Sequence, residues 1–180
     1  VTGGHNGTLI FNDLAASPGV ISATNGGGLF FENADGAYTF NDKVTLNGGN
    51  AHIEILGTGD AANGSEGTFT FVDADITNPA GDGVLPTPDA AIEIDDSEVI
   101  FTYTGTIVSN VTDAVILTNN SGGSITFNST IASTQGMLIQ DNAAGTILFA
   151  DAITLTGAGA GIRILENTGA NVTFSGTIAS

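Results

Sequence analysis

The chain contains no cysteine and no tryptophan, and each absence excludes a class of chemistry. Without cysteine there is no disulfide bond, no thiolate metal site and no cysteine nucleophile. Without tryptophan, and with Tyr38 reading as a core residue, the chain has few rings on which a sugar can stack. No stretch is long and apolar enough to cross a bilayer as a helix.

Positive charge is nearly absent as well. Lysine and arginine together number 2 against 19 aspartates and glutamates, so the formal net charge is −17. This balance argues against nucleic-acid binding, because phosphate contacts need lysine and arginine. Anionic membrane surfaces are disfavoured for the same reason. We interpret the acidic surface mainly as a solubility feature, because like charge keeps β-structures apart.

The residues that are present favour short strands over helices. Charged residues make up only 12% of the chain, hydrophobic residues make up 41%, and there are 26 glycines. Helices favour leucine, glutamate, lysine and arginine, whereas this mixture with asparagine, threonine and serine suits strands joined by tight turns.

Seven short runs that end in phenylalanine reveal an internal repeat. They read TLIF, AYTF, TFTF, EVIF, SITF, TILF and NVTF, and they end at Phe11, Phe40, Phe71, Phe101, Phe127, Phe149 and Phe174. Successive phenylalanines are 22 to 31 residues apart. The residue two before each phenylalanine is also large and apolar, and a period of two places both on one face of a strand.

Two more strands are predicted after each run. The apolar markers of the second strand are Leu14, Val44 with Leu46, Ile76, Ile107, Ile131, Ile153 with Leu155, and Ile178. The third strand is predicted at residues 29–31, 52–55, 91–94, 115–117, 137–139 and 162–164. An asparagine ladder is predicted just past the third strand, formed by Asn33, Asn120, Asn142 and Asn167.

Three strands per repeat and one recurring core face predict an all-β, single-stranded parallel β-helix, or β-solenoid, of about six to seven coils. Coils stack about 4.8 Å apart, which gives a rod roughly 30 Å long. We expect residues 1–180 to form one β-helix domain that is a segment of a longer repeat array. The competing fold is an antiparallel sandwich, which gives no reason for phenylalanine at one phase. Two irregular loops, at 57–67 and 78–89, are candidate functional insertions.

The best-placed acidic group is the run IEIDDSEVI, which supplies Glu93, Asp95, Asp96 and Glu98. Strand alternation directs Glu93 and Asp95 outward. These carboxylates are the candidate metal ligands, and a catalytic pair or a solvated face are the other interpretations.

Other chemistry is sparsely supplied. A lyase would need cationic groups, but Lys43 and Arg163 are far apart in sequence and read as lone surface charges. His5 and His52 read as exposed polar residues without a catalytic setting. We therefore predict no catalytic site and no bound cofactor, and we leave calcium open as the one ion. Its further oxygen donors would be Asp73 with Asp75, Asp82 in the second irregular loop, or Asp141 with Asn142. The outward positions of the first strands carry threonine too irregularly for a flat ice-binding ladder.

The runs GIRILENTGANVTFSGTIAS and AVILTNNSGGSITFNSTIAS resemble the repeats of secreted bacterial right-handed parallel β-helix proteins, such as autotransporter passengers and filamentous haemagglutinin-like adhesins. The resemblance implies export to the extracellular space or cell surface and a stalk or adhesive role.

We expect a non-catalytic structural stalk or adhesin segment of a large exported protein. A self-assembling subunit of an extracellular filament and a polysaccharide-active β-helix enzyme are the alternatives. The expected partners are neighbouring coils or other copies of the chain, with glycans or a host surface as further candidates. No nucleic-acid partner and no membrane insertion are expected.

Overall fold

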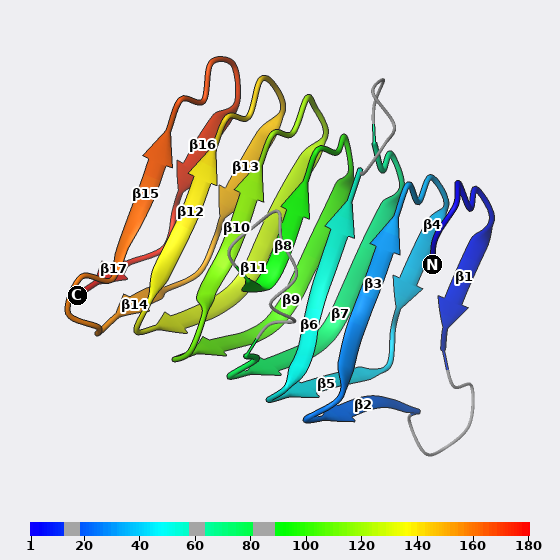
Figure 1. The fold of residues 1–180 in the computed structure, drawn as a ribbon, viewed down its shortest axis with the longest axis horizontal. Coiled ribbons are helices and arrows are strands. Elements are labelled where there is room, and N and C mark those ends of the chain that lie inside the picture. The colour runs from blue at the N-terminus through cyan, green and yellow to red at the C-terminus, as the bar shows by residue number, and fades with distance from the viewer. Residues whose placement is uncertain (13–18, 58–63, 81–88) are drawn as a thin grey trace.

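The computed structural model describes residues 1–12, 19–57, 64–80 and 89–180. All regular structure in these ranges is β, and none of their segments forms a helix able to span a bilayer (Figure 1). The strands are β1 (Thr8–Phe11), β2 (Val20–Thr24), β3 (Gly27–Glu32), β4 (Ala37–Phe40), β5 (Lys43–Asn47), β6 (Asn50–Leu56), β7 (Thr68–Thr77), β8 (Ala90–Asp95), β9 (Ile100–Ser109), β10 (Asp113–Thr118), β11 (Ser124–Ser133), β12 (Gly136–Gln140), β13 (Thr146–Phe149), β14 (Ile153–Leu155), β15 (Gly161–Leu165), β16 (Asn171–Phe174) and β17 (Ile178–Ala179).

The strands form two sheets that run the length of the molecule and face one another across the core (Figure 1). The first sheet runs β1-β4-β7-β9-β11-β13-β16, and β2, β5, β14 and β17 extend it on one side. The second sheet runs β15-β12-β10-β8-β6-β3. Each pairing between described strands is parallel, and partners lie one repeat apart in sequence. The all-β parallel prediction is confirmed, and the antiparallel sandwich is contradicted.

Alternation of apolar and polar residues builds the core between the sheets. The inward side chains of both sheets form one cluster that runs the length of the described repeats. Aromatic rings stack in its centre: the centroids of Phe127 and Phe149 are 4.9 Å apart with an interplanar angle of 1°, and those of Phe40 and Phe71 are 4.5 Å apart. Parallel pairing places equivalent side chains directly above one another, so a single phenylalanine per repeat becomes a continuous column.

One member of the predicted phenylalanine column is wrong by two residues. Tyr103, and not Phe101, pairs with Phe71 on one side and with Phe127 on the other. The register between β7 and β9 shifts between Phe71 and Ala74, where β7 carries a bulge. The two-residue offset lies before this bulge, since Thr68 already pairs with Ile100, and an offset of two keeps every side chain on its face, so hydrophobic alternation alone does not detect it.

The predicted third strands are confirmed, and their inward residues pair in unbroken columns. The second-strand markers from Val44 onward all lie in strands. A separate second strand is confirmed for β5, β14 and β17, but it is wrong for the three repeats in which one ten-residue strand (β7, β9 or β11) contains both the phenylalanine run and the marker. Leu14 lies outside the described residues, as do parts of both irregular loops. In the first repeat the sequence pattern did not identify β2, which pairs with β5.

The turns after five of the six third strands, all except β6, begin with a non-glycine residue of positive φ. These residues are Asn33 (48°), Asp96 (51°), Asn119 (56°), Asp141 (56°) and Glu166 (54°). Their backbone N–H groups donate across repeats, as from the amide of Asp96 to the carbonyl of Thr118 at 3.1 Å. Asparagine and aspartate tolerate this left-handed conformation better than most residues, which explains their frequency at this corner.

The asparagine ladder occupies the position that follows this turn residue. Asn120, Asn142 and Asn167 hydrogen-bond in series through their side chains, as predicted. Asn33 does not belong to the ladder, because it occupies the positive-φ position one residue earlier. Ser65 holds the ladder position in an earlier repeat, where its hydroxyl accepts a hydrogen bond from the Ala34 amide at 3.0 Å.

Candidate functional site

Glu93 is the first of the four predicted metal-ligand candidates, and it is buried where a solvent-exposed side chain was one of the expectations. It lies on the outward side of β8, opposite Ile116 of β10, but its exposed fraction is only 3%. Ile116, Ala90 and Leu138 form a small buried apolar cluster on the same side of the second sheet. The interpretation of Glu93 as part of a solvated face is therefore wrong.

Asp95 and Glu98 bind neighbouring repeats. The carboxylate of Asp95 accepts a hydrogen bond from the Thr118 hydroxyl at 2.6 Å and another from the side-chain amide of Asn119 at 2.8 Å. Glu98 accepts a hydrogen bond from the Ser121 hydroxyl at 2.8 Å. Both carboxylates link their own repeat to the next one, which is a structural use of these oxygens.

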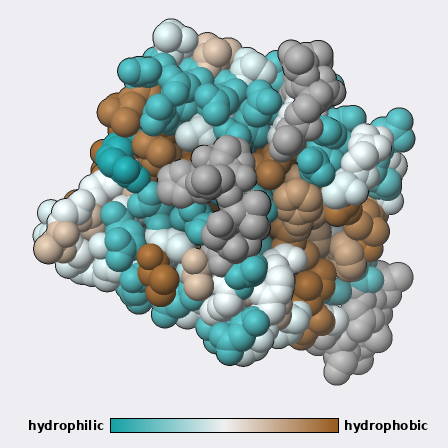
Figure 2. Space-filling model, viewed as in Figure 1, coloured by the Kyte–Doolittle hydropathy of each residue, from teal (hydrophilic) through white to brown (hydrophobic). Residues whose placement is uncertain are grey.

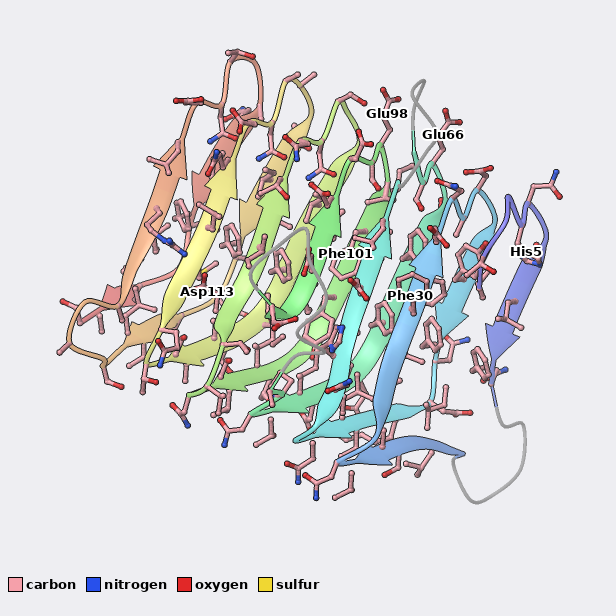
Figure 3. All side chains as sticks on the ribbon, in the orientation of Figure 1. His5, Phe30, Glu66, Glu98, Phe101 and Asp113 are labelled. Carbon is pink, nitrogen blue, oxygen red and sulfur yellow. The ribbon has the colours of Figure 1, made fainter. Side chains whose placement is uncertain are left out.

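The four carboxylates do not converge on one point. Asp96 is the positive-φ turn residue, and Glu98 lies at the turns along the edge of the sheets (Figure 3). Within the described ranges, no three histidine, aspartate or glutamate side chains form a group able to hold a metal ion. Asp82, in the second irregular loop, lies outside those ranges.

Asp73 and Asp75, the other predicted oxygen donors, hold the chain's lysine. The ammonium group of Lys43 lies 2.7 Å from Asp73 and 2.6 Å from Asp75, and the hydroxyl of Thr106 also donates to Asp75. The hydrogen bond from Lys43, followed by that from Thr106, lowers the pKa of the Asp75 carboxyl. The hydrogen bonds to Asp73 and Asp75 raise the pKa of Lys43. The expectation that Lys43 is a lone charge is wrong.

The chain's arginine is paired too. A guanidinium nitrogen of Arg163 in β15 lies 2.6 Å from the carboxylate of Asp113 in β10, so the pair spans β12. The Asp113 side chain is only 10% exposed, and burial raises the pKa of its carboxyl although Arg163 acts in the opposite direction. This pair lines a cleft of about 530 Å³ that also includes Gln135 (Figure 3).

Both histidines contact other side chains. A ring nitrogen of His5 lies 2.9 Å from the hydroxyl of the buried Tyr38. His52 is 8% exposed, and its Nε2 lies 3.5 Å from the carboxylate of Glu54. The prediction of exposed, isolated histidines is therefore wrong for His52 and incomplete for His5. No sequence signal distinguished them, because their partners come from alternation within β6 and from the next repeat.

The first repeat opens an apolar cleft that the sequence analysis did not anticipate. It measures about 330 Å³ and is lined by inward residues of β1 and β3, including Leu9, Phe11 and Leu29. Phe30 beside it is 39% exposed (Figure 3). Figure 2 shows hydrophobic residues gathered on the side of the molecule where β3 lies. The end of the column exposes side chains that the interior repeats bury.

Comparison with known proteins finds no matching family model, no matching curated protein and no matching solved structure. The function is therefore inferred from the geometry of the chain itself.

Proposed function

We propose that the chain is a parallel β-helix with three strands per coil and that it serves as a non-catalytic stalk or adhesin segment of a large exported cell-surface protein. The observation that carries this proposal is the continuity of the stack. Backbone pairing, the aromatic column and the Asn120–Asn142–Asn167 ladder each link one repeat only to its neighbours. Such nearest-neighbour architecture produces a stiff rod whose length scales with the number of repeats.

The placement of charge supports a structural role. Lys43 and Arg163 are both committed to carboxylates of other repeats, and Asp95 and Glu98 accept hydrogen bonds from the next repeat. These groups tighten contacts between coils. The extracellular or cell-surface location rests on the resemblance of the Asn-, Gly- and Thr-rich repeats to secreted β-helix proteins.

A polysaccharide panel tests the non-catalytic assignment. The purified chain, incubated with acidic and neutral polysaccharides, should release no new reducing ends or unsaturated products. Asp95→Asn and Asp113→Asn are the matched variants. Product formation that either variant abolishes would overturn the stalk assignment and establish the enzyme alternative. Retention of glycan-coated or host-cell-coated beads would identify the adhesive form of the proposal.

A filament subunit is the second candidate, and one observation favours it. Inward positions of the terminal strands remain partly exposed, including Phe11 at 36% on β1 and Ile164 at 49% on β15. Unpaired strand edges with apolar side chains favour addition of further strands. Electron microscopy of the purified chain, with and without calcium, separates the two candidates. Dispersed short particles support the stalk segment, and filaments of uniform width support end-to-end assembly.

A further inference from the structure

One part of the outward side of the first sheet carries no charged residue on its described strands, and we name this part the threonine face. Its positions alternate with core residues along β1, β4, β13, β16 and the first halves of β7, β9 and β11. They are Thr8, Ile10, Ala37, Thr39, Thr68, Thr70, Ile100, Thr102, Ser124, Thr126, Thr146, Leu148, Asn171 and Thr173. The corrected register places Thr39, Thr70, Thr102 and Thr126 in one unbroken column.

Other outward surfaces of the chain do carry charge. The outward side of the second sheet includes Glu54 and Arg163, and the other part of the first sheet includes Lys43 and Asp75. Acidic residues also border the threonine face, since Glu66 and Glu98 lie at the turns that lead into it (Figure 3). Fourteen adjacent outward positions of a chain with a net charge of −17 are thus neutral.

A neutral face on an acidic chain is suited to contact with another acidic chain, because no carboxylates repel one another there. Two copies with a charge of −17 repel one another at surfaces that carry carboxylates, and they approach at least cost through the threonine face. Flat sheets pack face to face about 10 Å apart, with side chains of the two faces interdigitating. Ile10 and Ile100, which are 57% and 53% exposed, supply apolar surface that such packing would cover.

We propose that the threonine face pairs with the same face of a second copy, which makes a side-by-side dimer. β9 is the central strand of the seven that form the face, so a two-fold arrangement brings Thr102 close to Thr102 of the second copy. This association is independent of the stalk role, because it concerns the surface of the chain and not its export or ligand.

The dimensions of the face predict a weak association. Six strand intervals of about 4.8 Å by four residues of about 3.3 Å give roughly 400 Å² for each copy. Stable complexes bury about 800 Å² for each partner. Pairing should therefore be reversible and detectable only at high protein concentration. It should strengthen as salt is added, because salt screens the repulsion between the acidic chains.

Sedimentation across protein and salt concentration measures this association. The wild-type chain should form dimers at high concentration, with more dimer at high salt. Thr102→Glu should weaken the dimer about tenfold or more, because two carboxylates then face one another. Thr154→Glu is the control: Thr154 is an exposed outward threonine of β14, between the buried Ile153 and Leu155, as Thr102 lies between Phe101 and Tyr103. It should dimerise like the wild type.

A chemical cross-link then locates the contact. The chain lacks cysteine, so Thr102→Cys introduces a single reactive thiol. A bismaleimide that spans about 10 Å should join two Thr102→Cys chains and leave Thr154→Cys chains unjoined. End-to-end assembly would separate the two Thr102 positions by the length of the rod. A wild-type chain that stays monomeric at every concentration, or equal behaviour of the Thr102 and Thr154 variants with unchanged melting temperatures, overturns the proposal.

Discussion

The side-chain amide of Asn120 donates a hydrogen bond to the side-chain oxygen of Asn142, one repeat further along the chain, at 2.8 Å. Asn142 repeats the interaction with Asn167 at 2.7 Å and also donates to the carbonyls of Leu117 and Gln140. Asn120 and Asn142 are buried, so water does not replace these bonds. The ladder thus provides hydrogen-bond donors for backbone carbonyl groups at the turns of successive repeats.

Replacing Asn142 with alanine should lower the free energy of unfolding by about 3 kcal/mol, because buried backbone and side-chain groups lose their partners. Urea denaturation measures the change. Asn128→Ala removes an exposed asparagine from β11 and should cost less than about 0.5 kcal/mol. Equal losses in the two variants would show that the ladder contributes nothing.

Truncating Phe127 should destabilise the chain strongly. Its ring stacks against Phe149 and is fully buried, so Phe127→Ala leaves a cavity in the aromatic column and should cost about 4 kcal/mol. Ile100→Ala, at an exposed position of the neighbouring strand, is the control and should change stability little. Thermal unfolding followed by circular dichroism checks both variants, and an unchanged Phe127→Ala midpoint contradicts the core assignment.

Alkaline pH should destabilise the fold through Tyr103. Its hydroxyl donates to the carbonyl of Ala74 at 2.8 Å, and burial raises its pKa well above 10.0. The folded state then keeps a proton that the unfolded state loses, so this contribution is intact below about pH 10 and is lost as the pH rises further. Tyr103→Phe should show a weaker loss between about pH 9 and pH 11, with Tyr38 accounting for what remains. Denaturant titrations at each pH, with tyrosinate absorbance as the readout, measure it.

Removing Arg163 should make stability depend more steeply on acid pH. Burial already raises the pKa of the Asp113 carboxyl, and Arg163→Gln removes the guanidinium that opposes this effect. The folded state then holds the proton to higher pH than the unfolded state does, so stability falls as the pH rises above about 4. Because Arg163 is half exposed, the loss at pH 7 should be only about 2 kcal/mol. Adding Asp113→Asn should remove the pH dependence, and its persistence in the double variant would contradict this account.

Alternation along the chain predicted the faces of the strands well. It predicted that Ile125 and Phe127 face inward because the residues on either side of them are polar. It did not predict that Tyr103 replaces Phe101 in the column, because a register offset of two residues, present from the Thr68–Ile100 pair onward, leaves every side chain on its face. It also missed β2, although Ile21 and Ala23 alternate with exposed residues and pair with the inward Val44 and Leu46, because the sequence pattern assigned the marker of that strand to Leu14.

Charges were harder to place than strands. The sequence identified Asp95 and Glu98 as prominent carboxylates, but their Thr118 and Ser121 partners lie in the next repeat and emerge only from the register. Lys43 meets Asp75 across 32 residues for the same reason. Glu93 alternates outward as expected, yet it is buried, because alternation reports the side of a sheet and not what covers that side.

The parallel register fixes how this molecule would respond to force. Hydrogen bonds between repeats point along the stack, so tension applied to the two ends is carried by the inter-repeat rows in series, and the weakest row opens first. Phe127 and Phe149 are 22 residues apart, so each row that opens would release about 70 Å of extended chain. Pulling would therefore open the stack in discrete steps of this length, and the repeats that remain folded would keep their contacts.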